Sequence, residues 1–191
     1  MFVGAVLRYS RLNGCSPAGM DTPPVLIEIS IISGIPRHTV VGLANGAIRE
    51  AMDRIRAAIA AVGLSFPRGA ITINLAPADT RKEGSSFDLP IALGMLLADG
   101  QIECEHDVSS FVVMGELTLD GGVRSVRGVL PAIASASAVG ITHFIVPEGN
   151  RNEALLLEDT HIHCVSHLAE AIDVVTGKRI PERPVQAQQR C

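Results

Sequence analysis

The chain has 191 residues, with 16 Lys+Arg and 20 Asp+Glu, so its formal net charge at pH 7 is −4. This length suits a single domain, and 47% hydrophobic residues with 19% charged residues exclude a disordered chain. Five Phe, one Tyr and no Trp provide few rings on which nucleic-acid bases could stack. Composition therefore excludes an autonomous nucleic-acid-binding protein and leaves room only for a local basic patch.

No stretch of the sequence suggests a membrane segment or a secreted protein. The apolar runs fall short of the roughly 20 residues that span a bilayer, and the N-terminus lacks the pattern of a signal peptide. The cysteines are scattered, without a CxxC pair or a disulfide-like spacing: Cys15, Cys104, Cys164 and Cys191. We expect a cytoplasmic protein with reduced thiols and no membrane partner.

Hydrophobic periodicity predicts alternating strands and helices in the first half of the chain. Alternating apolar residues predict strands at 25–32 and 70–75, and shorter strands are expected at 2–9 and 38–41 as an antiparallel N-terminal set. Apolar residues three and four apart predict helices at 44–62, ended by Gly63, and at 87–99.

The second half continues the alternation. Strands at 111–114 and 116–119 are followed by a turn at 120–122, and further strands are predicted at 144–146 and 161–165. Helices are predicted at 129–139, 148–157 and 167–175. The order indicates an α/β fold with parallel pairing toward the C-terminus, a domain at 1–177, and a Pro- and Gln-rich linker at 178–191.

The segment NLAPADTRKEGSSFDLP, residues 74–90, is the most informative for chemistry. Ser85 with Asp88 three residues later matches a capping box, and Gly84 allows close backbone approach before the helix. A helix N-terminus beside Arg81 and Lys82 predicts an anion site. In the alternative interpretation, Ser85 and Asp88 only cap the helix while both cations face solvent.

Two other kinds of site find little support. No GxxxxGK[ST] motif is present, so we expect no nucleotide site in this chain. Imidazole and thiol groups that could bind a metal occur at His161, His163, Cys164 and His167. On a strand His161 and His163 share one face and Cys164 points to the other, so we expect no metal and a solvent-exposed strand edge.

Two long motifs, NLAPADTRKEGSSFDLPIALGML and MGELTLDGGVRSVRGVLPA, together with residues 27–59, resemble the N-terminal domain of the ComM/YifB family of magnesium-chelatase-like AAA+ ATPases. The resemblance extends over residues 2–177. It implies a Lon-protease-like domain: two-layer α/β, with a mixed sheet whose N-terminal part is antiparallel and helices packed on it. It also implies a hexameric ATPase that acts in DNA branch migration during natural transformation, with its ATP- and magnesium-binding module following Cys191.

The same resemblance bears on catalysis. The nucleophilic serine of Lon-type peptidases corresponds to Ser86, and the lysine that serves as its base corresponds to Leu130. Leucine cannot accept a proton, so we expect no enzyme activity from this chain alone. The alternatives are a serine–lysine peptidase with Ser86 as nucleophile, for which Lys82 would have to replace the missing base, and a small-molecule phosphate-binding enzyme.

Basic residues offer a surface for a polyanion. Arg49, Arg54 and Arg56 have Glu50 and Asp53 nearby, so we expect that helix face to be internally paired. The basic residues of the two long motifs, Arg81, Lys82, Arg124 and Arg127, have fewer acidic residues near them in sequence than these helix arginines have. If these cations converge, they would contact DNA phosphate or an acidic surface of the ATPase ring. The residues expected at this contact are Arg81, Lys82, Gly84, Ser85, Ser86, Arg124 and Arg127.

Overall fold

A computed structural model of the chain describes residues 8–16, 23–42, 46–77, 85–104 and 107–179. Its main sheet has seven strands in the order β3-β4-β2-β1-β5-β8-β9, and β6 and β7 form a separate pair. The strands are β1 (Arg8–Gly14), β2 (Val25–Ile32), β3 (Arg37–Val41), β4 (Ala70–Ala76), β5 (Phe111–Val113), β6 (Glu116–Leu117), β7 (Val123–Arg124), β8 (His143–Pro147) and β9 (His161–Val165). The helices are α1 (Gly46–Ala61), α2 (Asp88–Ala98), α3 (Val129–Ala138), α4 (Arg151–Ala154) and α5 (Leu168–Val175), with 3-10 turns at Val108–Ser110 and Glu148–Asn150.

The main sheet is mixed. Strand β2 pairs antiparallel with β1 and with β4, whereas β1-β5, β5-β8 and β8-β9 are parallel. These pairings confirm the antiparallel N-terminal part and the parallel C-terminal part. Strand β3 differs from the prediction because it does not join the antiparallel set. It pairs parallel with β4, to which the helical crossover α1 connects it.

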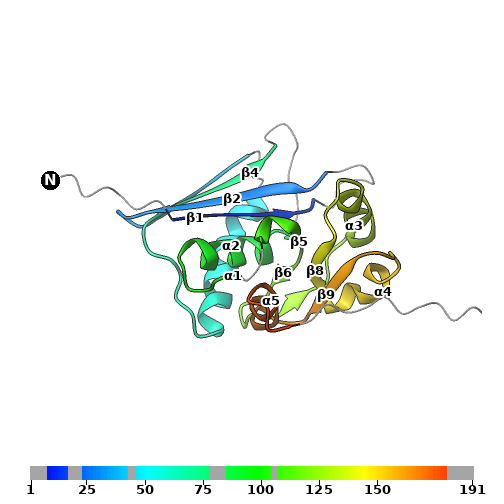
Figure 1. Ribbon diagram of the computed structural model, residues 1–191. Coiled ribbons are helices and arrows are strands. Elements are labelled where there is room, and N and C mark those ends of the chain that lie inside the picture. Colours follow the sequence, from blue (N-terminus) through cyan, green and yellow to red (C-terminus); the bar gives the residue numbers. More distant parts are fainter. Residues whose placement is uncertain (1–7, 17–22, 43–45, 78–84, 105–106, 180–191) are drawn as a thin grey trace, which may run out of the picture.

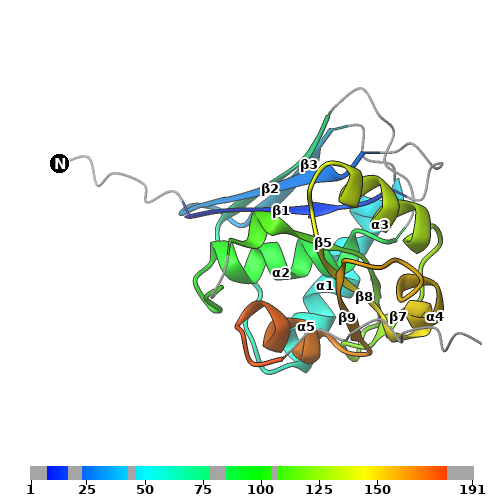
Figure 2. The same cartoon turned by 45° about the vertical axis from the view of Figure 1, so that its right-hand side comes forward.

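Helices α1 and α2 cover one face of the N-terminal half of the sheet (Figure 1). The alternation in β2 explains why: Val25, Ile27, Ile29 and Ile31 are buried, while the residues between them are only half-buried. The C-terminal half is covered on both faces. Helix α5 lies on one side of β8 and β9 and α3 on the other (Figure 2). Buried residues of α5 pack with those of α2 in one core cluster, and those of α3 pack with Val112 and Phe144 in another.

Two predicted boundaries are wrong. The first strand, predicted to end at residue 9, runs on to Gly14; its described part begins at Arg8, and the strand predicted at residues 2–7 stays a prediction because residues 1–7 are not described. Most side chains of this strand are polar and Leu12 is its buried large hydrophobic residue, so the sequence shows little of the apolar alternation that predicts a strand. Residues 148–157 form a 3-10 turn and the four-residue helix α4 rather than one helix, with Gly149 in the turn. The linker at 178–191 stays a prediction, since residues 180–191 are not described.

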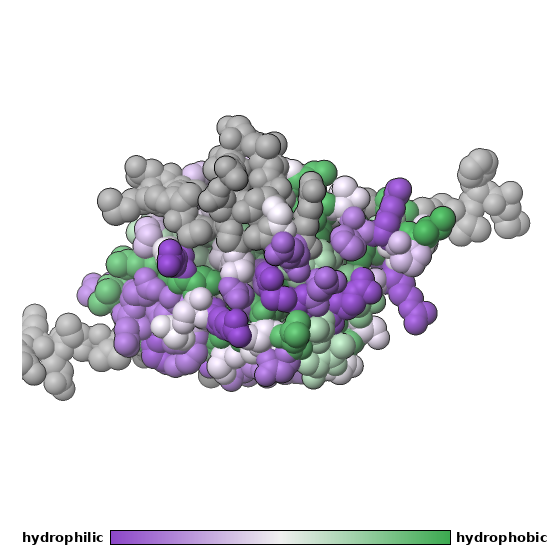
Figure 3. All heavy atoms as spheres, turned by 180° about the vertical axis from the view of Figure 1, so that it is seen from behind, coloured by the Kyte–Doolittle hydropathy of each residue, from purple (hydrophilic) through white to green (hydrophobic). Residues whose placement is uncertain are grey.

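The surface is ordinary for a folded domain. On the face seen from behind, hydrophilic side chains dominate and hydrophobic ones form separate small patches (Figure 3). Within the described residues, no helix combines the length and apolar character needed to cross a bilayer.

Candidate functional site

The turn that leads into α2 contains the predicted anion site. Helix α2 begins at Asp88, after Phe87, whose ring is fully buried. The predicted capping box is not formed, because Phe87 is the N-cap and no side chain caps the helix. Instead Ser85 donates a hydrogen bond to the Glu116 carboxylate, and Asp88 faces Arg54. Ser85 and Asp88, which the local motif assigned to helix capping, therefore bond to residues distant in sequence.

An ion pair between the half-buried Arg54 and the buried Asp88 connects α1 to the start of α2. Arg54 donates to the Asp88 carboxylate from Nε at 2.8 Å and from Nη2 at 3.1 Å, and the Leu117 amide donates to Asp88 at 3.2 Å. Burial raises the pKa of the Asp88 carboxyl, against the lowering effect of Arg54. In turn, the hydrogen bond that Arg54 donates to Asp88 raises the pKa of the Arg54 guanidinium. The expected pairing within α1 is thus wrong for Arg54, whose partner lies 34 residues away.

Backbone carbonyls already accept the first amides of α2. The Asp88 amide donates to the Ser85 carbonyl at 3.2 Å, the Leu89 amide donates to the Gly115 carbonyl at 3.0 Å, and Pro90 has no N–H. The carboxylates of Asp88 and Glu116 add negative charge at the same place. Phosphate contact at this turn would depend on Arg81, Lys82 and Gly84, which lie outside the described residues, so it stays a prediction.

Ser86 is buried, with 4% of its surface exposed, and its Oγ donates to the Cys15 carbonyl at 3.1 Å. Burial raises the pKa of the Cys15 thiol to about 11, so this neighbour stays protonated at neutral pH. Leu130 lies in the first turn of α3. The sequence has two lysines: Lys178 follows α5, and Lys82 lies outside the described residues. Among the residues that the structure describes, no basic group is hydrogen-bonded to Ser86.

Arg124 approaches this site through Glu116. Its guanidinium lies 3.6 Å from the Glu116 carboxylate, which also accepts the hydrogen bond from Ser85. The Arg124 side chain is 68% exposed, and Arg127 is exposed as well. The structure therefore brings Arg124 and Ser85 to a shared carboxylate, while Arg127 stands in solvent.

Among the described residues, no three His, Cys, Asp or Glu side chains, these histidines included, are placed so that they could hold a metal ion together. His161 is exposed and stacks on His143 with ring centroids 4.5 Å apart, but His163 and Cys164 are buried. The predicted solvent-exposed strand edge is therefore wrong for His163 and Cys164. His167 instead caps α5, where its Nδ1 accepts from the Ala169 amide at 3.3 Å.

Comparison with known proteins identifies the family. Residues 27–150 match the family model described as subunit ChlI of Mg-chelatase. The competence protein ComM of Haemophilus influenzae is 39% identical over 170 residues, covering 89% of this chain and 32% of that protein. The chain belongs to the ComM/YifB family. An uncharacterized protein YifB of Salmonella typhimurium is 38% identical over 167 residues, covering 87% of this chain and 33% of YifB.

The chain spans about a third of the length of these ComM and YifB relatives. A Lon protease of Halothermothrix orenii is 24% identical over 163 residues, covering 79% of this chain and 20% of that protease. This similarity agrees with the mixed sheet and its helical layer, and the ComM/YifB chain has a Lon-like α/β fold.

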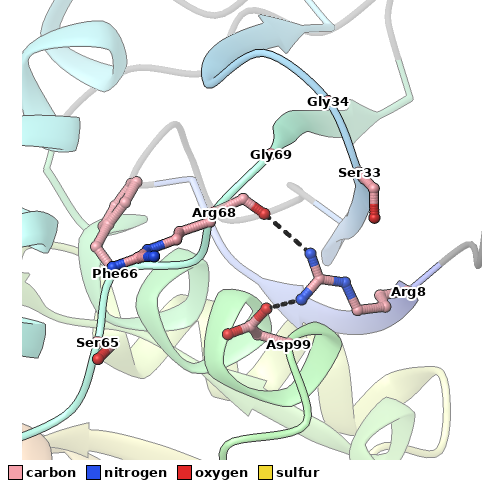
Figure 4. Close-up of a pocket in the computed structure, with 8 residues that line it drawn as sticks. All are labelled: Arg8, Ser33, Gly34, Ser65, Phe66, Arg68, Gly69 and Asp99. Atoms are coloured by element: carbon pink, nitrogen blue, oxygen red, sulfur yellow. Dashed lines mark hydrogen bonds and ion pairs between the residues drawn. The ribbon is translucent and has the colours of Figure 1, made fainter.

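Sequence reasoning missed a basic region of this ComM/YifB chain at the opposite end of α2. A pocket of about 450 Å³ lies where the start of β1, the end of β2 and the end of α2 meet (Figure 4). Arg8 ion-pairs with Asp99 there and donates to the Arg68 carbonyl at 2.9 Å. Residues from segments distant in sequence form this region, so no local sequence motif predicts it.

Proposed function

We propose that this chain is the Lon-like, non-peptidase domain of a ComM/YifB-type AAA+ ATPase that drives DNA branch migration during natural transformation in the cytoplasm. In this proposal the domain helps to assemble a hexameric ring and contacts DNA, while a module outside this chain binds ATP and magnesium. The ChlI family match and the 39% identity to a competence protein support the ATPase and the process.

The environment of Ser86 carries the non-peptidase part of the proposal. A serine nucleophile needs a base within hydrogen-bond reach and access to its substrate. Ser86 is 4% exposed and its hydroxyl donates to the Cys15 carbonyl, an arrangement that suits a structural role. Leu130 stands where the resemblance to Lon places the lysine, and a hydrocarbon side chain cannot accept the proton.

A serine-reactive phosphonate probe tests this directly. We expect no labelling above that of the Ser86→Ala variant, and no cleavage of unfolded casein, because no base activates the hydroxyl. Ser110→Ala, at a half-buried serine before β5, is the matched control. Labelling that is lost in Ser86→Ala and kept in Ser110→Ala would show an active nucleophile and refute the non-peptidase assignment.

Experiments with the full-length protein test the ATPase, ring-assembly and branch-migration parts of the proposal. We expect ATP hydrolysis and movement of a four-way DNA junction by the full-length protein, and neither by this chain alone. Removing residues 1–177 should weaken hexamer formation and branch migration, while the nucleotide site remains in the other module. ATP hydrolysis by this chain alone, or full branch migration without it, would contradict the proposal.

A further inference from the structure

A groove of about 680 Å³ runs beside the edge strand β3. We call it the basic groove and define it by Arg37 and His38 of β3, Arg56 of α1, and Phe66 and Arg68 of the segment between α1 and β4. Residues 66, 68 and 69 also line the pocket of Figure 4, so the two hollows are adjacent. Three elements that are distant in sequence therefore bring their cations to one hollow.

The charges of the basic groove are not neutralised. No carboxylate lines it, and within the described residues neither Arg37, Arg56 nor Arg68 forms an ion pair. All three are exposed. In the adjacent pocket the carboxylate of Asp99 is already paired with Arg8 (Figure 4). The groove thus concentrates unpaired positive charge on a chain whose net charge is −4.

This arrangement suits a polyanion such as a phosphodiester chain. Like charges held together repel, and a bound polyanion relieves that repulsion. The planar guanidinium groups match phosphate oxygens in pairs. The Arg56 guanidinium already lies over the Phe66 ring, 4.3 Å from its centroid, so the aromatic face in the groove is covered. Recognition would therefore use the sugar-phosphate backbone rather than stacking on bases.

We propose that the basic groove binds the phosphodiester backbone of a nucleic acid and is the main DNA-contacting surface of this domain. The choice of a nucleic acid rests on the proposed function. The groove shares no lining residue with the turn at Ser85, where Glu116 places a carboxylate beside Arg124 and Asp88 pairs with Arg54. It can therefore be removed without touching the residues first expected to contact DNA.

Fluorescence anisotropy with a labelled DNA duplex tests the groove in this chain. We expect the triple variant Arg37→Ala, Arg56→Ala and Arg68→Ala to weaken binding by about 10–100-fold, and the slope of log K against log salt to become shallower by about 3, because three phosphate contacts are lost. A variant with lysine at the same three positions keeps the charge and should retain most of the affinity.

The matched control removes the same charge at residues outside both the groove and the turn at Ser85: Arg11→Ala and Lys178→Ala, which are exposed, and Arg151→Ala, which pairs with Glu148 at the surface. Thermal melting establishes that both triple variants are folded. Equal weakening by the two sets would mean that only net charge matters and would overturn the inference, as would binding of inorganic phosphate or ATP as tight as that of the duplex. If the full-length protein drives branch migration and its groove triple variant does so equally well, the groove is not the DNA contact. That result would refute this inference and leave the proposed function standing.

Discussion

Replacement of Arg54 by methionine is expected to destabilise the domain by about 3–5 kcal/mol at neutral pH. The Asp88 side chain is 1% exposed, and Arg54 supplies two of the hydrogen bonds that compensate for its burial. Methionine fills a similar volume but leaves a buried carboxylate without a counter-charge. Chemical denaturation at pH 7 and 25 °C measures the change in the free energy of unfolding.

The cost should depend on pH in a defined direction. Burial raises the pKa of Asp88 above its ordinary value, and loss of the guanidinium raises it further. The folded variant then holds a proton that the unfolded chain releases as pH rises above about 4, so the variant loses stability as pH rises through the raised pKa. The destabilisation should therefore be larger at pH 8 than at pH 5.

Two further variants give the prediction its controls. Arg124→Met removes an ion pair that is exposed and 3.6 Å long, so it should cost less than about 1 kcal/mol. Arg54→Met combined with Asp88→Leu removes both charges and should recover part of the loss, although the Leu117 amide then lacks its acceptor. If Arg54→Met cost no more than Arg124→Met, the pair would not stabilise the junction between α1 and α2.

This pair also shows where prediction from sequence stops. The alternation in Val25–Ile32 and the three-four spacing in residues 44–62 define one buried face each, so these elements were predicted correctly. The capping box at Ser85 failed because Arg54 and Glu116, distant in sequence, compete for the same side chains. A four-residue motif contains no information about such partners.

The basic groove illustrates the same limit for function. Arg37, Arg56 and Arg68 lie on a strand, a helix and a connecting segment, and only the parallel pairing of β3 with β4 brings them together. The sequence placed Arg56 near Asp53 and indicated a paired helix face. In the structure Arg56 instead lies over Phe66, a contact that depends on the path of the chain after α1. Clusters built from several elements need the topology before they can be recognised.

Acidification from pH 6.5 to pH 4 is expected to destabilise the domain through His163, by up to about 3 kcal/mol. Burial is the main cause that lowers the pKa of His163 to about 4, and the positive charge of His143, Arg179 and His161 acts in the same direction. The unfolded chain therefore binds a proton between pH 6.5 and pH 4 that the folded chain refuses. The stability that the neutral ring provides is complete above pH 6.5 and is lost as pH falls toward 4.

His163→Phe tests this assignment. Nδ1 of His163 is buried without a hydrogen-bond partner among the described residues, so an apolar ring loses no bond there, and Phe111 lies nearby with ring centroids 6.2 Å apart. Urea unfolding at a series of pH values should show a flatter profile for this variant than for its parent, and comparison at each pH cancels the contribution of Asp88. His38→Phe, at an exposed histidine away from this cluster, should lose as much stability between pH 6.5 and pH 4 as its parent does. An unchanged pH profile in His163→Phe would assign the acid sensitivity to other groups.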